Sequence, residues 1–158
     1  VVGGTQSGEV VIGAQGTRAE RLSTLTRVRA IGVSADAGRF AVAGSGGRLQ
    51  VFDTGEPTSP LSEFRVEGDV LQLACSKEGK LVGVNRRDGR TSIHLAETGL
   101  EIGVFESVGD GLKALVFTEE SELYGVDVDE DAFRVVDCAR RETLERVFER
   151  SRVQVTGS

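Results

Sequence analysis

The sequence is poor in several residue types that often carry chemistry. It has no tryptophan and no methionine, and only two prolines, two cysteines and one histidine among 158 residues. No apolar run approaches the length that a membrane-spanning helix needs, so we expect no membrane partner. The single histidine, His94, would have to serve every mechanism that uses an imidazole base, which narrows the enzyme classes open to this chain.

The two cysteines, Cys75 and Cys138, are far apart and form no C-x-x-C motif of the kind found in zinc and redox sites. Cys75 lies in the apolar run LQLAC, where a thiol behaves as a small hydrophobic side chain. We therefore expect free thiols rather than a disulfide, and a reducing, cytoplasmic location.

Acidic residues outnumber basic ones, with 25 Asp and Glu against 19 Lys and Arg, which gives a formal net charge of −6. A chain with this balance repels phosphate backbones. We therefore expect no nucleic-acid partner.

The segment VVGGT at residues 1–5 resembles the mature N-terminus of a trypsin-like protease. However, His94 lies in TSIHLAETG rather than in A-A-H-C, and no G-D-S-G-G follows it. The nearest serine motif, GSGG at residues 44–47, precedes the histidine, and the G-x-S-x-G elbow of α/β-hydrolases is absent. We therefore predict no catalytic residues and no enzyme activity.

Internal repetition is the strongest signal in the sequence. Four segments share alternating apolar residues followed by a polar position: GEVVIGAQGT (8–17), GRLQVFDTGE (47–56), RTSIHLAETG (90–99) and AFRVVDCARR (132–141). Three segments have an acidic residue at that position, Asp53, Glu97 and Asp137, and the first has Ala14 instead. The four residues are 39 to 44 positions apart. A period of about forty residues is typical of one four-stranded blade of a β-propeller.

Other strand-like segments keep the same period. RAIGVSA, VLQLACS and KALVFTE begin near residues 29, 70 and 113, and RFAVAG, KLVGVN and ELYGVD begin at residues 39, 80 and 122. The last strand of each repeat is predicted to end at an apolar residue, namely Leu25, Phe64, Phe105 or Phe148. We predict an all-β fold, a single propeller segment of about four four-stranded antiparallel blades at residues 1–26, 27–67, 68–109 and 110–150.

The tract ARRETLERVFERSR at residues 139–152 has helical features, because Leu144, Val147 and Phe148 could share one helix face. Its counterpart in the previous repeat, TGLEIGVFESV, is rich in β-forming residues and contains a glycine. Since the two tracts occupy the same place in the repeat, we predict a strand here. A terminal helix is the alternative.

With these strand classes in place, the chain resembles the WD-repeat class of β-propellers and, more loosely, the bacterial propellers with Y-V-T-N repeats. The likeness covers nearly the whole chain, and Phe52-Asp53 and Val136-Asp137 stand where the WD family has Trp-Asp. No Gly-His pair precedes a first strand, so the family's Asp-His-Ser-Trp hydrogen-bond network cannot form. The resemblance implies the propeller architecture without that network.

The first blade lacks an innermost strand, because Val1 already belongs to the second strand of the repeat. Residues 151–158 contain RVQVTGS, whose alternation suits an innermost strand that closes the ring or begins a further blade. Three arrangements stay open: a piece of a longer propeller, a half-ring that pairs with a second copy, and a small closed ring. We expect a partial or half propeller, whose open ends favour self-association.

One acidic segment is a candidate metal site. VDVDEDAF at residues 126–133 spaces Asp127, Asp129 and Asp131 as positions 1, 3 and 5 of an EF-hand loop. Position 6 is Ala132 instead of glycine, and position 12 is Cys138 instead of glutamate. We interpret this segment as a solvated acidic hairpin and predict no metal site and no cofactor.

His94 and the segment NRRDGR are two further candidate sites. His94 has no second histidine or cysteine nearby, and we predict a polar residue between blades at the position of Gln50 and Arg134.

NRRDGR at residues 85–90 is predicted to be a charged hairpin tip, and its Arg86 and Arg87 are candidate contacts for an acidic partner loop. VGDG at residues 108–111 lacks the lysine of a P-loop and is predicted to be an inter-blade loop.

These features predict a non-catalytic propeller domain that acts as a protein–protein interaction scaffold, because rigid blades leave the connecting loops free to vary. The alternative is a ligand-binding or sensory propeller domain of a larger signalling or enzymatic protein.

Overall fold

The computed structural model describes residues 2–13, 20–23, 25–106, 112–120, 122–129, 132–137 and 148–149. In this part of the chain there are fifteen β-strands, one 3-10 turn and no α-helix. No helix there is long and apolar enough to cross a membrane. The predicted loop VGDG (108–111), Asp131, Cys138 and the predicted strand at 151–158 lie outside the described residues.

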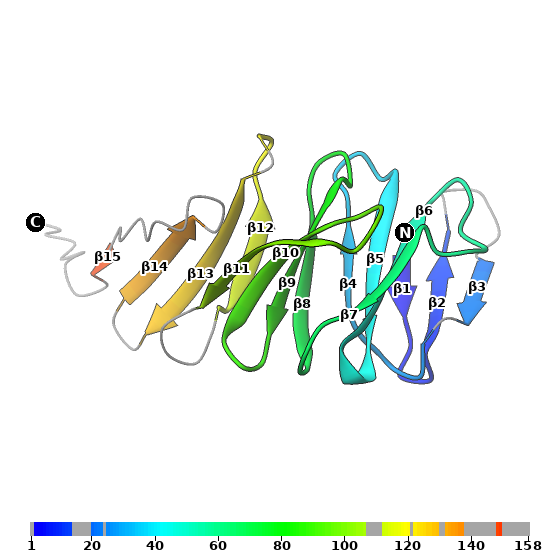
Figure 1. Cartoon of the computed structure of the whole chain (residues 1–158), viewed down its shortest axis with the longest axis horizontal. Helices are drawn as coiled ribbons and strands as arrows, with labels where there is room; N and C mark the ends of the chain where they lie inside the picture. Colours follow the sequence, from blue (N-terminus) through cyan, green and yellow to red (C-terminus); the bar gives the residue numbers. More distant parts are fainter. Residues whose placement is uncertain are drawn as a thin grey trace, which may run out of the picture.

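The strands form four antiparallel sheets in chain order, and Figure 1 shows them side by side along the long axis of the molecule. The first sheet contains β1 (Val2–Gly4), β2 (Glu9–Ile12) and β3 (Glu20–Ser23). The second contains β4 (Val28–Val33), β5 (Arg39–Gly44), β6 (Arg48–Asp53) and β7 (Ser62–Arg65). The third contains β8 (Val70–Cys75), β9 (Leu81–Arg86), β10 (Arg90–Leu95) and β11 (Glu101–Glu106). The fourth contains β12 (Ala114–Phe117), β13 (Leu123–Asp129), β14 (Ala132–Asp137) and β15 (Phe148–Glu149).

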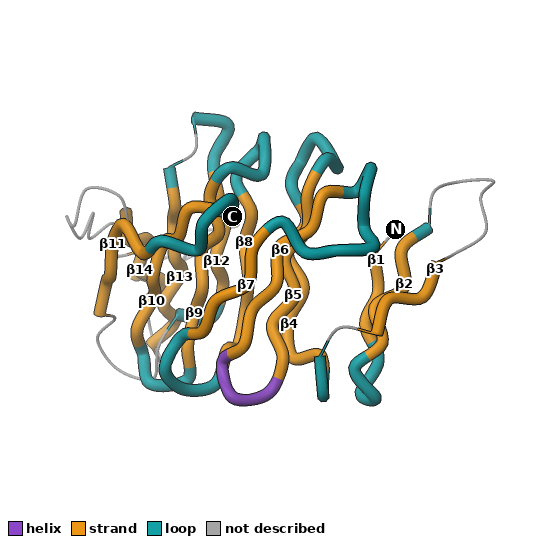
Figure 2. The backbone as a smooth tube through the Cα atoms, turned by 45° about the vertical axis from the view of Figure 1, so that its right-hand side comes forward, coloured by secondary structure: helices purple, strands orange, loops and turns teal. Residues whose placement is uncertain are grey.

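Each sheet is a meander, in which every strand pairs with the strand before it in the sequence. Tight turns at glycines make this possible. The β5–β6 hairpin closes through the 3-10 turn η1 (Ser45–Gly47), which Figure 2 shows in purple. Gly47 has φ +73°, and a Cβ atom at this position would lie 2.1 Å from the carbonyl oxygen of Val66. Only glycine therefore fits this turn.

The first sheet has three strands among the described residues, and β1 contacts β4 in the way that β5 contacts β8 and β9 contacts β12. The strand β1 is thus the counterpart of β5 and β9, the second strands of their sheets, as the sequence repeat predicts for VVGG. A strand is also present at Phe148–Glu149, where the sequence favoured strand over helix.

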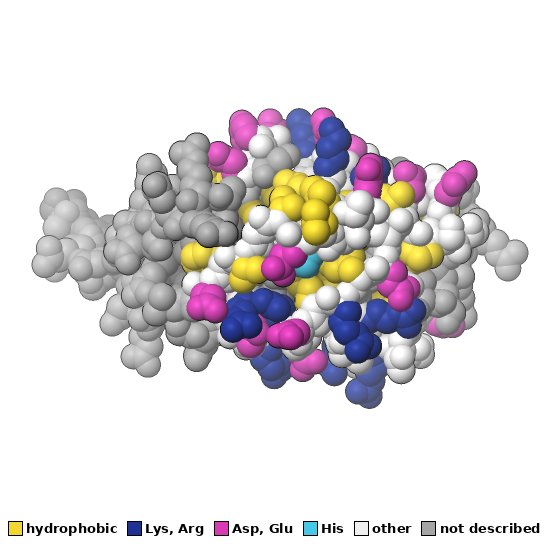
Figure 3. Space-filling model, in the orientation of Figure 1, with side chains coloured by type: hydrophobic (Ala, Val, Ile, Leu, Met, Phe, Trp, Pro, Cys, Tyr) yellow, Lys and Arg dark blue, Asp and Glu magenta, His cyan; other side chains and the backbone are white. Residues whose placement is uncertain are grey.

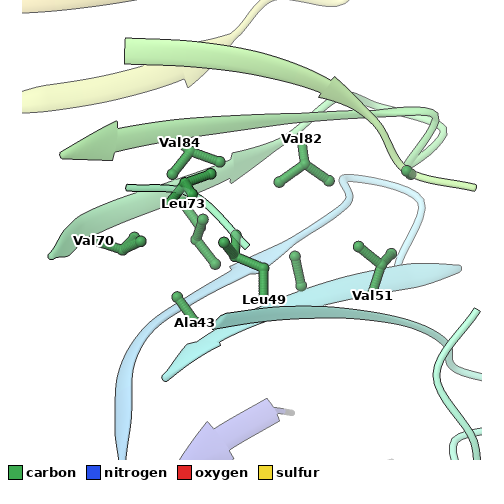
Figure 4. Close-up of a cluster of buried hydrophobic side chains, with 10 residues drawn as sticks. Ala43, Leu49, Val51, Val70, Leu73, Val82 and Val84 are labelled. Carbon is green, nitrogen blue, oxygen red and sulfur yellow. The ribbon is translucent and has the colours of Figure 1, made fainter. Parts of the chain in front are cut away.

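Three clusters of buried side chains join neighbouring sheets. The cluster between the second and third sheets includes Ala43, Leu49 and Val51 on one side and Val70, Leu73, Val82 and Val84 on the other (Figure 4). A second cluster joins the first and second sheets around Val10, Phe40 and Phe52, and a third joins the last two sheets around Ile93 and Leu123. Full burial of one such side chain contributes roughly 1.5–3 kcal/mol, so these clusters supply most of the stability.

Several hydrogen bonds of the second sheet recur at equivalent positions of the third. The hydroxyls of Ser34 and Ser76 accept the backbone N–H groups of Arg39 and Leu81. The backbone N–H groups of Thr54 and Ala96 donate to Gly38 and Lys80.

Two predictions of register were wrong. The hydrogen-bond register makes His94 equivalent to Phe52, not to Gln50, and Asp53 equivalent to Leu95, not to Glu97. The two polar residues differ in place, because Asp53 ends β6 whereas Glu97 lies in the turn after β10. Leu25 does not end a strand; it follows β3 and is buried between the first two sheets.

Candidate functional site: the groove between the second and third sheets

A groove of about 340 Å³ lies where the ends of β7 and β9 meet β10 and β11. Its charged and apolar lining includes Arg65, Glu67, Arg86, Arg90, Val104 and Glu106. The groove forms because the outer strands of neighbouring sheets diverge, whereas their inner strands pack closely through the shared cluster.

Arg86, the last residue of β9, is the buried cation of this groove, with 5% of its surface exposed. Its Nη1 donates to the carbonyl of Glu67 at 3.3 Å, and its Nε lies 3.7 Å from Oδ1 of Asp88. That Nε has no hydrogen-bond acceptor among the described residues. A buried donor without an acceptor is costly, so the guanidinium group of Arg86 is not fully satisfied by its present partners.

The NRRDGR hairpin separates its three arginines. Arg90 lines the groove and pairs with Glu106 at 3.2 Å across β10 and β11. Arg87 points away, with 71% of its side chain exposed, and lies 3.8 Å from Asp69. The predicted charged hairpin joins β9 and β10. Arg87 is exposed at its tip, whereas the side chain of Arg86 is buried and reaches the Glu67 carbonyl.

His94 lies in β10 and is 3% exposed. Its Nε2 is 2.8 Å from the hydroxyl of Ser92 and its Nδ1 is 3.0 Å from the carbonyl of Gly99. Its ring stacks on Phe64 of β7, with centroids 4.7 Å apart. Burial lowers the pKa of His94 below its usual value, and the hydrogen bond to Gly99 opposes this in part. Both ring nitrogens are engaged within the third blade, and the contact of the ring with Phe64 joins this blade to the second.

An exposed apolar row borders the groove, and sequence reasoning missed it. Leu100, Ile102 and Val104 are 60%, 50% and 37% exposed, and the last two lie on β11, the outermost strand of the third sheet. Figure 3 shows hydrophobic side chains gathered on the face that carries β7 and β11. The segment LEIGV has the alternation of any half-buried strand, so only its place at the edge reveals the exposure.

The remaining candidates do not converge. The described part of the chain holds no cluster of three His, Cys, Asp or Glu side chains suited to a metal ion. Asp127 and Asp129 lie in β13, which pairs with β14. Cys75 is a free thiol whose pKa is raised by burial to about 12, and Ser45 of GSGG lies in the η1 turn.

The fold is that of solved β-propellers. The β-propeller domain of Cps50 (Swd1) from Myceliophteria thermophila matches with a TM-score of 0.71 at 16% sequence identity, over 90% of this chain and 49% of that one. Sqt1 from Chaetomium thermophilum, solved bound to the N-terminus of the ribosomal protein L10, matches with a TM-score of 0.74 at 18% identity, over 94% of this chain and 45% of that one. No protein-family model and no curated protein matches the sequence.

This chain therefore has the architecture of a WD-repeat-like β-propeller and spans about half the length of the propeller chains it matches. The predicted fold class, an all-β partial propeller of about four antiparallel blades, is confirmed. The second and third sheets, between which the groove lies, are two complete blades with four strands each.

Proposed function

We propose that this chain is a non-catalytic propeller domain that binds a protein partner and acts as a scaffold. The observation that carries the proposal is the exposed apolar row of Leu100, just before the outermost strand of the third blade, and Ile102 and Val104 on that strand. Exposed apolar rows on an edge strand are typical of surfaces that another chain covers. The Sqt1 propeller, which shares this fold, is bound to a segment of another protein.

The arrangement of His94 supports the non-catalytic part of the proposal. An imidazole that acts as a general base needs a free nitrogen within reach of a substrate. The His94 nitrogens are within hydrogen-bond distance of Ser92 and Gly99, and the ring is buried against Phe64. The acidic balance of the chain supports a protein rather than a nucleic-acid partner, and the free Cys75 suits a reducing cytoplasm.

The test is affinity capture from a lysate of the source organism, with the wild-type chain and two variants as bait. We expect Ile102→Glu to lose the captured protein, because a carboxylate would be placed in an apolar contact. Val33→Glu is the matched control, since Val33 is 43% exposed on β4, outside the row. Equal capture by all three baits would contradict the role of this surface, and an empty capture would contradict the binding function.

A second candidate function is self-association through the open face of the fourth blade. Val116 of β12 is 54% exposed, whereas Ala74, at the equivalent position of β8, is buried in the cluster that joins the third and fourth blades. We expect the chain to form dimers in light scattering and Val116→Glu to shift it towards monomers. A wild-type chain that stays monomeric at all concentrations would contradict this candidate.

A further inference from the structure

The groove between the second and third blades combines two features that the interaction surface alone does not explain. Six buried side-chain polar atoms lack a hydrogen-bond partner in the described part of the chain, and only one of them, Nε of Arg86, belongs to a charged side chain. It is also the only one of the six whose residue lines the groove. The nitrogen itself is buried, but the side chain that carries it lines the groove.

No acidic side chain of the groove accepts a hydrogen bond from Nε of Arg86. Glu106 is already 3.2 Å from Nε of Arg90, and its own side chain is 72% exposed. Glu67 contributes its backbone carbonyl to Arg86, and the residue is exposed, as is Glu101. The nearest carboxylate oxygen to Nε is that of Asp88, at 3.7 Å, too long for a hydrogen bond.

The second feature is the strand that forms one wall. Val104 both lines the groove and belongs to the exposed apolar row, so the groove and the row are one continuous surface. β11 has no strand on its outer side among the described residues. An extended peptide can pair with such an edge through its backbone and place alternate side chains on one face.

We propose that this groove binds an extended, acidic peptide segment of a protein partner. The peptide lies along β11 with aliphatic side chains over Ile102 and Val104, and an Asp or Glu side chain enters the groove and pairs with the guanidinium groups of Arg86 and Arg90. Guanidinium groups suit this role because their planar donors match a carboxylate. The proposal rests on the proposed binding function and specifies its site and the chemistry of the partner.

The probe is a library of random twelve-residue peptides displayed on phage and selected on the intact chain. Enriched peptides are then synthesised, and their affinity is measured by fluorescence anisotropy. We expect them to carry Asp or Glu beside alternating aliphatic residues, and to bind Arg90→Glu and Val104→Glu at least about tenfold more weakly than the wild type.

Two matched variants control for charge and for loss of an exposed valine. Arg87→Glu reverses a charge on the same hairpin outside the groove, and Val33→Glu changes an exposed valine on another blade; both should retain the wild-type affinity within about twofold. Circular dichroism of all four variants confirms that they are folded. Three results would overturn the proposal that the groove binds an acidic peptide: enrichment of basic peptides, equal binding to all variants, or no enrichment. A partner that is captured through Ile102 and is insensitive to Arg90→Glu would leave the proposed function intact and still refute the acidic-peptide site.

Discussion

At the scale of single residues, His94 shows how a polar side chain can join two blades. Its ring stacks on Phe64 of the preceding blade, and its nitrogens are engaged by Ser92 and by the carbonyl of Gly99. Burial disfavours the charged imidazolium, so the pKa of His94 is lowered in the folded chain. The neutral ring is therefore part of the folded structure.

This predicts a loss of stability in mild acid. The unfolded chain takes up a proton on His94 near pH 6.5, whereas the folded chain resists protonation until a lower pH. The contribution of this residue is thus fully present above about pH 6.5 and falls as the pH decreases towards the lowered pKa. Urea unfolding at pH 7.5, 6.5 and 5.5 measures the loss, and His94→Gln should reduce it. An identical pH dependence in the variant would contradict the prediction; carboxylates titrate mainly below this range.

At the scale of elements, β6 and β11 have similar alternating sequences and opposite surroundings. In β6, Leu49 and Val51 are 0% and 1% exposed, because blades pack on both faces of the second sheet near its centre. In β11, Ile102 and Val104 remain exposed because this strand is the rim of the third sheet. Position within the sheet, and not the residue pattern, decides which apolar side chains stabilise the fold.

We expect Leu49→Ala to lower the free energy of unfolding by about 2–5 kcal/mol, because it leaves a cavity in the cluster between two blades. Leu100→Ala, at a side chain that is 60% exposed, should change it by less than about 0.5 kcal/mol. Urea denaturation monitored by circular dichroism measures both values. Equal losses in the two variants would show that the rim leucine is also covered in solution.

At the scale of the whole molecule, the blades are joined in series. The Ser62 hydroxyl donates to the carbonyl of Ala96 at 2.6 Å between the second and third blades, and the Asn85 amide donates to the carbonyl of Leu112 at 2.8 Å between the third and fourth. Each buried cluster is likewise shared by two neighbouring sheets. Middle strands that have blades on both sides should therefore be the most stable part of the chain.

Native-state hydrogen exchange tests this arrangement. We expect the amides of β5 and β9, whose residues 40–44 and 82–86 are all buried, to exchange slowest. The amides of β11 should exchange much faster, because this strand is at the edge and partly exposed. Slow exchange along β11 in the isolated chain would contradict the free edge on which the peptide proposal depends.

The repeat of about forty residues was enough to predict the strands, their order and the four antiparallel sheets, because alternation and glycine turns are local properties of the chain. The register was less accessible: His94 was misplaced because the alignment matched Asp53, which ends a strand, with Glu97, which lies beyond one. Leu25 was misplaced because an apolar residue buried between sheets has the same pattern as one that ends a strand. The sequence singled out Arg86 as a candidate contact, but it did not predict the groove that this residue lines. Arg86 and Arg87 are adjacent and identical in type, yet one is buried between blades and the other is exposed. Packing of distant segments decides that difference, and it also decides that Leu100, Ile102 and Val104 are left uncovered at the rim.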